Sequence, residues 1–315
     1  MQRKNNHVYS TFFRAFGVTL LLMGVVLATV CLAFYLRQNR PQQDVSQLPT
    51  VYLPRKEERL NILLTGAEDG LTDPDCYLLF GFLPDKGRIA LCMLPPKTYV
   101  EYGGEATTLQ GLYQKGGIAY ARKALEQYLQ IPLDRWAKMD VEGLSRLMSM
   151  TGLMDYYLPV DLNGKLHGRK VVMPKGSYSL DGRKTYDILA YPSYKGGEVE
   201  RSDRGAMLVS QLVSENLPAF LTDVGDKLIK AVLDVMETDL SYKDYETRKS
   251  AASFLAKLDL PATAVVYIEG SMSVDKTIFY LTPSCMNRIQ EMYLADDEAI
   301  ATKPVGEAAA IQDNR

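Results

Sequence analysis

Two arginines stand one helical turn apart in the stretch KGGEVERSDRGAMLVSQLV. Arg201 and Arg204 follow a glycine-containing loop at residues 195–197 and lie near the start of a predicted helix. Residues three apart share a helix face, and guanidinium groups beside a helix N-terminus can hold an anion. The alternative is that both arginines are solvated and pair with Glu198 and Glu200. The spacing alone favours this alternative, and the rest of the chain favours an anion site.

Composition excludes several other kinds of chemistry. The 315 residues carry a formal net charge of -2, which argues against a nucleic-acid-binding protein, because such proteins are usually basic. The chain has two histidines and four cysteines without a CxxC spacing, so a zinc site and a Cys/His or Ser/His/Asp relay lack their parts. At most one disulfide can form outside the apolar N-terminal run, and we expect none among Cys76, Cys92 and Cys285.

The N-terminal region is expected to anchor the chain in a membrane. Residues 1–14 are polar and basic, and residues 15–36, AFGVTLLLMGVVLATVCLAFYL, contain no charge. A helix needs about 20 apolar residues to cross a bilayer, and this run exceeds a signal-peptide core, so we predict an uncleaved transmembrane anchor. The basic residues at 1–14 favour a cytoplasmic N-terminus. Residues 37–59 are polar and proline-containing and predict an extended tether outside the membrane.

The arginine pair must be positioned by a folded domain at residues 60–294. Apolar runs typical of strands alternate with segments of helical period, which predicts an α/β fold with a mixed sheet sandwiched by helices. Residues 295–315 lose all periodicity and are expected to be a disordered tail. The expected strands are 60–66, 76–83, 88–94, 133–139, 156–160, 170–174, 262–270 and 276–282, and the expected helices are 116–130, 141–152, 199–216, 224–236, 242–258 and 284–294.

Four segments resemble a known family. They are NILLTG followed by DPDCYLL, MLPPKTYVEYGG, the long stretch from TLQGLYQKGG to MDYYLPV, and LDGRKTYDILAYPSYKGGEVERSDR. In order and spacing they are similar to the LytR-CpsA-Psr family of bacterial membrane-anchored glycopolymer transferases. The resemblance covers roughly residues 60–294, and a single N-terminal anchor fits it. It implies an α/β/α domain outside a bacterial cell membrane, crossed once with the N-terminus inside.

The resemblance also implies an activity. The family is thought to move a glycopolymer from an undecaprenyl pyrophosphate carrier to peptidoglycan, with arginines on the pyrophosphate, acidic groups on Mg²⁺ and an apolar groove for the lipid. Phosphoryl transfer depends mainly on charge neutralisation and positioning, so such a set is chemically reasonable. The expected partners are therefore a polyprenyl (pyro)phosphate-linked glycopolymer, peptidoglycan and the membrane, and no nucleic acid.

Several family positions match residue by residue. Asp75 matches the metal-binding aspartate, and Glu68 lies where the other acidic ligand is expected. Magnesium needs only one or two carboxylates together with phosphate oxygens and water. Arg201 and Arg204 match the paired helix arginines. Asp75 and these two arginines are thus the expected catalytic residues, and Asp75 and Glu68 are the expected metal ligands.

Two lysines are expected to contribute positive charge to the phosphate site. Lys195 stands where one member of the family's Arg-x-Arg pair would be, and it keeps the charge but not the planar fork of a guanidinium. Lys97 lies in the place of the family's Pro-Arg-Asp-Thr-Tyr-Val segment. With Arg201, these lysines form the expected phosphate-binding set.

Other positions depart from the family pattern. Asp73 replaces the arginine before the metal-binding aspartate, Pro96 falls in the Arg-Asp pair, Ser193 replaces the other Arg-x-Arg member, and Gly205 replaces a glutamine. Each lost contact to a charged group is worth about 1.5–3 kcal/mol, so such a pocket would hold a dianion less well. A catalytically impaired relative that binds a polyprenyl-linked glycan or an envelope partner is therefore the alternative function. An unrelated α/β envelope domain is a third.

Overall fold

The structure is a computed structural model that describes residues 52–259 and 261–294. The predicted anchor at 15–36, most of the tether at 37–59 and the tail at 295–315 lie outside these residues, so those predictions remain predictions. Within the described residues, no helix has the length and apolar character needed to span a membrane.

A mixed six-stranded sheet forms the centre of the domain, in the order β11-β6-β1-β2-β3-β12. Its middle strands are apolar runs buried on both faces, as expected for strands covered by helices on each side. The sheet strands are β1 (Leu60–Ala67), β2 (Cys76–Leu83), β3 (Arg88–Leu94), β6 (Arg135–Asp140), β11 (Glu237–Thr238) and β12 (Thr263–Val265). Four two-stranded ribbons complete the strands: β4 (Tyr99–Tyr102) with β5 (Glu105–Thr108), β7 (Met154–Leu158) with β10 (Gly176–Leu180), β8 (Leu162–Leu166) with β9 (Arg169–Met173), and β13 (Gly270–Met272) with β14 (Phe279–Leu281).

The directions of the strands bring four strand termini together at one end of the sheet. β1 runs parallel to β6 and antiparallel to β2, and β2 runs antiparallel to β3. The ends of β1, β3 and β6 and the start of β2 therefore lie together. Glu68 and Asp75, the predicted metal ligands, lie between β1 and β2. The topology therefore places both residues at this end of the sheet.

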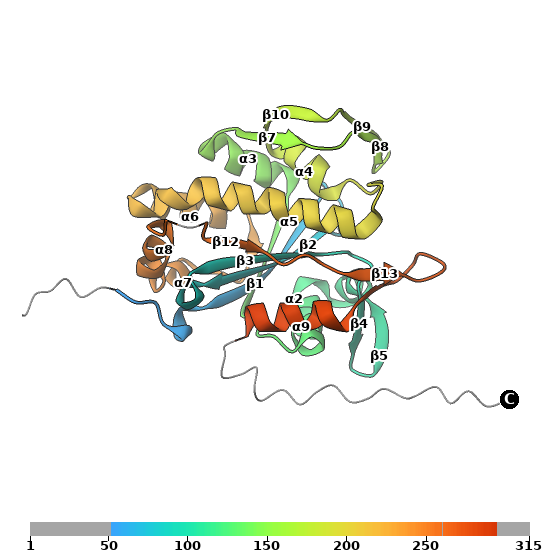
Figure 1. The fold of residues 1–315 in the computed structure, drawn as a ribbon, viewed down its shortest axis with the longest axis horizontal. Helices are drawn as coiled ribbons and strands as arrows, with labels where there is room; N and C mark the ends of the chain where they lie inside the picture. Colours follow the sequence, from blue (N-terminus) through green and yellow to red (C-terminus); the bar gives the residue numbers. More distant parts are fainter. Residues whose placement is uncertain (1–51, 260, 295–315) are drawn as a thin grey trace, which may run out of the picture. The chain divides into compact units, whose positions relative to one another are not determined.

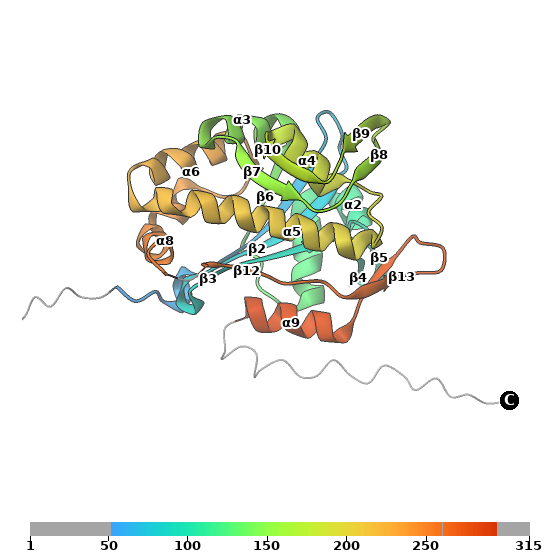
Figure 2. The same cartoon turned by 45° about the horizontal axis from the view of Figure 1, so that its top comes forward.

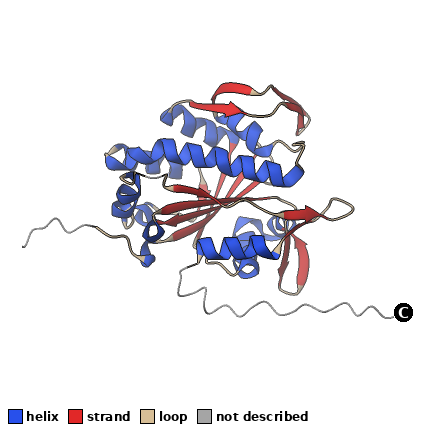
Figure 3. Ribbon diagram, viewed as in Figure 1, coloured by secondary structure: helices blue, strands red, loops and turns tan. Residues whose placement is uncertain are grey.

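Helices cover both faces of the sheet (Figures 1 and 3). α2 and α9 pack on one face, and α3, α4, α5, α6 and α8 lie on the other. In the view of Figure 2 the β7–β10 and β8–β9 ribbons lie over α4 and α5. The helices are α2 (Leu109–Leu129), α3 (Val141–Thr151), α4 (Gly182–Ala190), α5 (Gly197–Asn216), α6 (Val224–Asp234), α7 (Tyr242–Glu246), α8 (Lys249–Ala256) and α9 (Pro283–Tyr293). This confirms the predicted mixed α/β architecture.

Two helix predictions require correction. The expected single helix at 242–258 is two helices, because Arg248 leaves helical geometry between α7 and α8 and donates to the carbonyl oxygens of Glu58 and Arg59. Residues 182–190, which the expected helices do not include, form helix α4. The Asp181 side chain accepts from the Lys184 N–H at 2.8 Å, which supplies the N-cap that a helix needs at this point.

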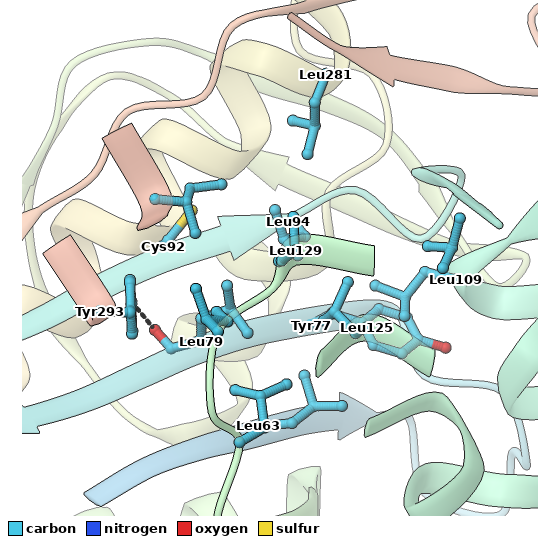
Figure 4. Packing of buried hydrophobic residues seen from close by; sticks show 14 of the residues in the cluster. Leu63, Tyr77, Leu79, Cys92, Leu94, Leu109, Leu125, Leu129, Leu281 and Tyr293 are labelled. Atoms are coloured by element: carbon cyan, nitrogen blue, oxygen red, sulfur yellow. Dashed lines mark hydrogen bonds between the residues drawn. The ribbon is translucent and has the colours of Figure 1, made fainter. Parts of the chain in front are cut away.

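Large apolar side chains fill the space between the sheet and the α2–α9 layer (Figure 4). Tyr293 of α9 lies across β2, and its hydroxyl donates to the Leu79 carbonyl at 2.8 Å. Its ring packs where a side chain at Gly81 would stand, since a Cβ there would come within 2.8 Å of the ring. Glycine at this position therefore lets α9 approach the sheet.

Cys76, Cys92 and Cys285 are buried free thiols in this structure. Burial raises the pKa of the Cys76 thiol to about 12 and also raises the pKa of Cys285.

We therefore expect a Cys31→Ser variant, which retains only these three thiols, to react negligibly with a disulfide reagent at pH 8 while it is folded. The thiolate is the reactive form, and at a pKa of about 12 only about one Cys76 in ten thousand is ionised at that pH. Unfolding in guanidinium should release all three thiols. A Ser193→Cys variant, in which the new thiol is exposed, is the positive control, and fast labelling of the folded parent variant would contradict the burial.

Candidate functional site

Asp75 lies at the start of β2, at the edge where β1 ends. Its backbone N–H donates to the Gly66 carbonyl at 2.8 Å, which closes the loop between the two strands. Its carboxylate is largely buried. His167 Nε2 lies 2.8 Å from Asp75 Oδ2, and the Tyr186 hydroxyl donates a hydrogen bond to the same oxygen. Burial, this hydrogen bond and the charge of Asp75 raise the pKa of Tyr186, and the Glu68 carboxylate adds to the shift. Both expected metal ligands therefore act on one phenol.

His167 reaches Asp75 from the turn of the β8–β9 ribbon. His167 and Gly168 both have positive φ, 49° and 80°, as in the tight turns that fit the twist of two-stranded ribbons. The same turn places Arg169 at the start of β9. One hairpin turn therefore delivers an imidazole to Asp75 and a guanidinium to the neighbouring carboxylates.

Glu68 is held by two arginines. Arg183, in the first turn of α4, contacts Glu68 Oε1 and lies 3.1 Å from Asp69 Oδ2. Arg169 Nη2 lies 3.7 Å from Glu68 Oε2, and the same guanidinium forms a two-pronged pair with the buried Asp187, whose Oδ2 is 3.0 Å from Nη1. These pairs tie the loop after β1 to α4 and to the β8–β9 ribbon.

The charges of this cluster do not balance. It contains the four carboxylates of Glu68, Asp69, Asp75 and Asp187 against the two guanidinium groups, which leaves two net negative charges when His167 is counted as neutral. Within the described residues, Glu68 Oε2 is buried and accepts no hydrogen bond. Excess negative charge beside an unused carboxylate oxygen is what a divalent cation would satisfy.

The fit to a metal ion is partial. No group of three or more His, Cys, Asp or Glu side chains among residues 52–259 and 261–294 is arranged to hold a metal. Asp75 and Glu68 supply two carboxylates at most. Magnesium commonly binds through one or two carboxylates and completes its shell with phosphate oxygens and water, so the two residues fit Mg²⁺ in the presence of a phosphate.

Arg201 and Arg204 have different environments, although the sequence presents them as a pair. Arg201 is 5% exposed and close to the Cys76 thiol, whose pKa its charge lowers against the larger effect of burial. Its Nη2 lies 3.0 Å from Glu198 Oε2 without hydrogen-bond geometry, so the buried Nε and Nη2 donate to no acceptor. Unsatisfied buried donors on a cation favour an anionic ligand.

Arg204 is already satisfied by protein groups. Its Nε and Nη2 lie 2.8 Å and 2.6 Å from Glu200 Oε1, and the guanidinium lies over the ring of Tyr194, 5.9 Å from the centroid. The sequence left open that both arginines pair with nearby glutamates instead of binding an anion. This alternative describes Arg204 well. It describes Arg201 only in part, because Arg201 also keeps donors without acceptors.

The two lysines do not point into this cluster. Lys97 lies at the same sheet edge, after β3, but its ammonium group donates to the Lys276 carbonyl in the β13–β14 turn at 3.0 Å. Lys195 is exposed in the turn before α5, where its charge contributes to lowering the pKa of Glu200, although burial of that carboxyl acts in the opposite direction. The structure therefore gives neither lysine a contact with Asp75 or Glu68.

Asp73 and Gly205 have a structural explanation among the departures from the family pattern, whereas the contact at Pro96 is a backbone one that any residue could make. Asp73 accepts from Gln114 Nε2 at 2.5 Å, so its negative charge is directed to α2. The Pro96 carbonyl accepts from the Gln110 N–H at 2.9 Å and anchors the start of α2. A Cβ at Gly205 would lie 2.1 Å from Met93 Sδ, so glycine allows α5 to pack against β3. Ser193 is exposed, and nothing in the structure explains the serine there.

An apolar cavity of about 420 Å³ runs between the sheet and helices α3, α5 and α6. Its lining extends along β1 from Leu60 to Gly66, a distance of roughly 20 Å at the rise of a strand. It also includes Cys76 and Tyr186, the neighbours of Arg201 and Asp75. The cavity therefore reaches the charged cluster at one end of the sheet.

Sequence reasoning missed three residues of this cluster. All three lie far from Asp75 in the chain, and none was assigned a role: His167 and Arg169 lie outside the four segments that resemble the family, and Arg183 lies in the fourth segment without a matched function. The His-Gly pair between two short β-prone runs was a usable hairpin signal, and it would have predicted a turn at 167–168. It would not have predicted what the turn contacts.

The family model described as the LytR_cpsA_psr family matches residues 33–291. The chain belongs to the LytR_cpsA_psr family. The teichoic acid transferase TagV of Bacillus subtilis, whose full name is polyisoprenyl-teichoic acid–peptidoglycan teichoic acid transferase, is 24% identical over 211 residues, covering 62% of this chain and 53% of the relative. TagU of Enterococcus faecalis, with the same activity in its name, is 26% identical over 198 residues, covering 60% of this chain and 64% of the relative. The matches thus cover less than two thirds of either relative's length.

Several solved structures share this fold. The crystal structure of B. subtilis TagV has a TM-score of 0.60 at 21% identity and covers 79% of this chain and 100% of the TagV chain. A structure described as a putative transcription regulator from Eubacterium siraeum has a TM-score of 0.69 at 17% identity and covers 77% of this chain and 93% of the other. At these identities the likeness establishes the fold, and the activity must be argued from the site.

Proposed function

We propose that this member of the LytR_cpsA_psr family is an envelope protein that takes a polyprenyl (pyro)phosphate-linked glycopolymer and transfers the polymer to peptidoglycan. The observation that carries this proposal is the apolar cavity whose lining includes Cys76, a neighbour of buried Arg201, and Tyr186, which donates to Asp75. An isoprenoid chain needs a long apolar channel, and its diphosphate needs cations at the end of that channel. The names of the TagV and TagU relatives support the same substrate class.

Within this proposal the protein's own groups have distinct roles. Arg201 offers buried, unused donors to the phosphate beside the cavity, and Asp75 and Glu68 would hold Mg²⁺. When bound, the metal would neutralise charge that develops on the phosphate oxygens. Residues 15–36 would anchor the chain once in a bacterial cell membrane, with the N-terminus inside and the domain outside next to the peptidoglycan.

One observation favours a second candidate, a relative that binds the lipid-linked glycan or an envelope partner without turnover. Of the two lysines expected at the phosphate, Lys97 donates to the Lys276 carbonyl and Lys195 is exposed in the turn before α5, and Nε and Nη2 of Arg204 both contact Glu200. The positive charge available for transition-state stabilisation is thus smaller than the sequence suggests. Binding depends on the cavity and survives this loss more easily than catalysis does.

A single pair of variants tests the role of the cavity. Val209 on α5 lines the cavity, whereas Met207, two residues earlier, is half exposed. We expect Val209→Trp to lower the affinity of the full-length protein for a polyprenyl diphosphate about tenfold or more, because the indole fills space that the lipid needs. Met207→Trp, the matched control, should bind like the wild type, and both variants should keep their affinity for inorganic pyrophosphate.

Transfer is measured on the same proteins, with a polyprenyl diphosphate-linked glycan as donor and peptidoglycan as acceptor, in Mg²⁺ and in EDTA. Polymer on peptidoglycan that depends on Mg²⁺ and falls in Val209→Trp supports the transferase. Lipid binding that responds to Val209→Trp without any transfer supports the second candidate. Lipid binding that is equal in both tryptophan variants and the wild type would contradict the proposed use of the cavity.

A further inference from the structure

Arg169 and Arg183 converge on one carboxylate from different elements. Arg183 comes from the first turn of α4 and contacts Glu68 Oε1, and Arg169 comes from the start of β9 and lies 3.7 Å from Glu68 Oε2. The two guanidinium groups therefore stand on either side of a single carboxyl group. Planar guanidinium donors of this kind suit the oxygens of a phosphate group.

Both guanidinium groups are held in place and still keep free donors. Arg169 is fixed by Asp187, and Arg183 is fixed by Asp69, while their side chains remain 39% and 38% exposed. A guanidinium has five N–H donors, and among the described residues neither Nε donates to a protein acceptor. Arginines ordered before the ligand arrives lose less conformational entropy on binding it.

The position of the pair matches the end of the cavity. Glu68 lies close enough to Tyr186 to act on its phenol, and Tyr186 both lines the cavity and donates to Asp75. Positive charge is scarce elsewhere at this edge, because Asp73 is negative and Lys97 is directed to the β13–β14 turn. The arginines of β9 and α4 are thus the exposed cations nearest to the two proposed metal ligands.

We propose that Arg169 and Arg183 are substrate-binding residues that contact the diphosphate at the end of the cavity where Tyr186 lies. They supply, from the β8–β9 turn and the start of α4, planar donors that this chain lacks at the motif positions 73, 96 and 193. The identity of the ligand as a lipid-linked diphosphate rests on the proposed function. The pairing with Glu68 couples these arginines to the proposed metal ligand, so metal and arginines act on the same phosphate.

Arg183→Gln is the sharper test, because Glu68 keeps Arg169 as a partner and Asp69 is exposed, whereas Arg169 neutralises buried Asp187. In the full-length protein with Mg²⁺, we expect this change to lower the affinity for polyprenyl diphosphate and for inorganic pyrophosphate about tenfold, the effect of one lost charged hydrogen bond. Binding of the uncharged polyprenol should not change. Arg183→Lys should recover only part of the loss, because an ammonium lacks the fork.

The matched control is Arg146→Gln on α3, where the arginine pairs with Glu142 at the surface. This substitution should leave the affinities for polyprenyl diphosphate, pyrophosphate and polyprenol unchanged. Thermal unfolding of each variant shows that the fold is intact. Wild-type diphosphate affinity in folded Arg183→Gln would overturn this inference and leave the proposed function standing. A wild-type protein that binds polyprenol but neither diphosphate would overturn it as well. Pyrophosphate binding that depends on Arg183 without any binding of lipid would sustain the inference and contradict the proposed function.

Discussion

Replacing Arg201 by methionine should lower the affinity of the protein for a polyprenyl diphosphate about a hundredfold. The guanidinium is 5% exposed, and its Nε and Nη2 donate to no acceptor in the described structure. Two charged hydrogen bonds to phosphate, at about 1.5 kcal/mol each, correspond to a factor of this size. Methionine retains much of the apolar stem, so the loss reports the charge more than the packing.

Arg204→Met is the matched control for this experiment. Both residues lie on α5, but Nε and Nη2 of Arg204 already contact Glu200. We therefore expect Arg204→Met to change the affinity for the diphosphate by about threefold or less. Titration calorimetry with polyprenyl diphosphate and with pyrophosphate measures both variants. Equal losses in the two would mean that the arginines act as the equivalent pair suggested by their spacing. No loss in Arg201→Met would remove the buried arginine from the phosphate site.

Replacing Gly182 by alanine should destabilise the domain by about 3 kcal/mol, at the upper end of the usual cost of overpacking. A Cβ at this position would lie 2.4 Å from both the N and the Cα of Ser145, so the obstacle is the backbone of α3 and cannot rotate away. Helix α4 would have to move, and it carries Arg183, Tyr186 and Asp187. We therefore expect thermal unfolding to begin roughly 10 °C lower and diphosphate binding to weaken with it.

Gly66→Ala provides the control for the change of glycine to alanine itself. A Cβ there meets only the Cys76 Cβ at 3.6 Å, an ordinary contact, and the backbone is not in the left-handed region. Its stability should stay within about 1 kcal/mol of the wild type. If Gly182→Ala also unfolds at the wild-type temperature, α3 and α4 do not cross as closely as the structure places them.

The Leu-Asp-Gly motif now has a physical explanation for each residue. Leu180 is fully buried, Asp181 caps α4, and Gly182 permits the close crossing of α4 over α3. The sequence identified the motif only as a turn signal and a family resemblance. It could not show that a helix follows, because four of the next nine residues, GRKTYDILA, are polar or charged and the segment is shorter than an isolated helix requires.

Local pattern was sufficient for the central elements. The uninterrupted apolar runs of β1, β2 and β3 and the periodicity of α5 are properties of neighbouring residues, so they can be predicted from the sequence directly. The order of the segments was enough to place the chain in its family. The same pattern also brought Glu68 and Asp75 to one sheet edge, because the end of one strand and the start of its antiparallel neighbour meet there.

Only the tertiary structure decided how charge is distributed over the site. Arg201 and Arg204 are the same residue type three positions apart on one helix, yet one is buried with donors that have no hydrogen-bond acceptor and the other is neutralised by Glu200. Arg169 and Arg183, which are remote from Asp75 in sequence, come to its neighbour Glu68 through the β8–β9 turn and α4. Charge pairing acts over a few ångströms of space whatever the separation along the chain, whereas motif and periodicity record only neighbours in sequence.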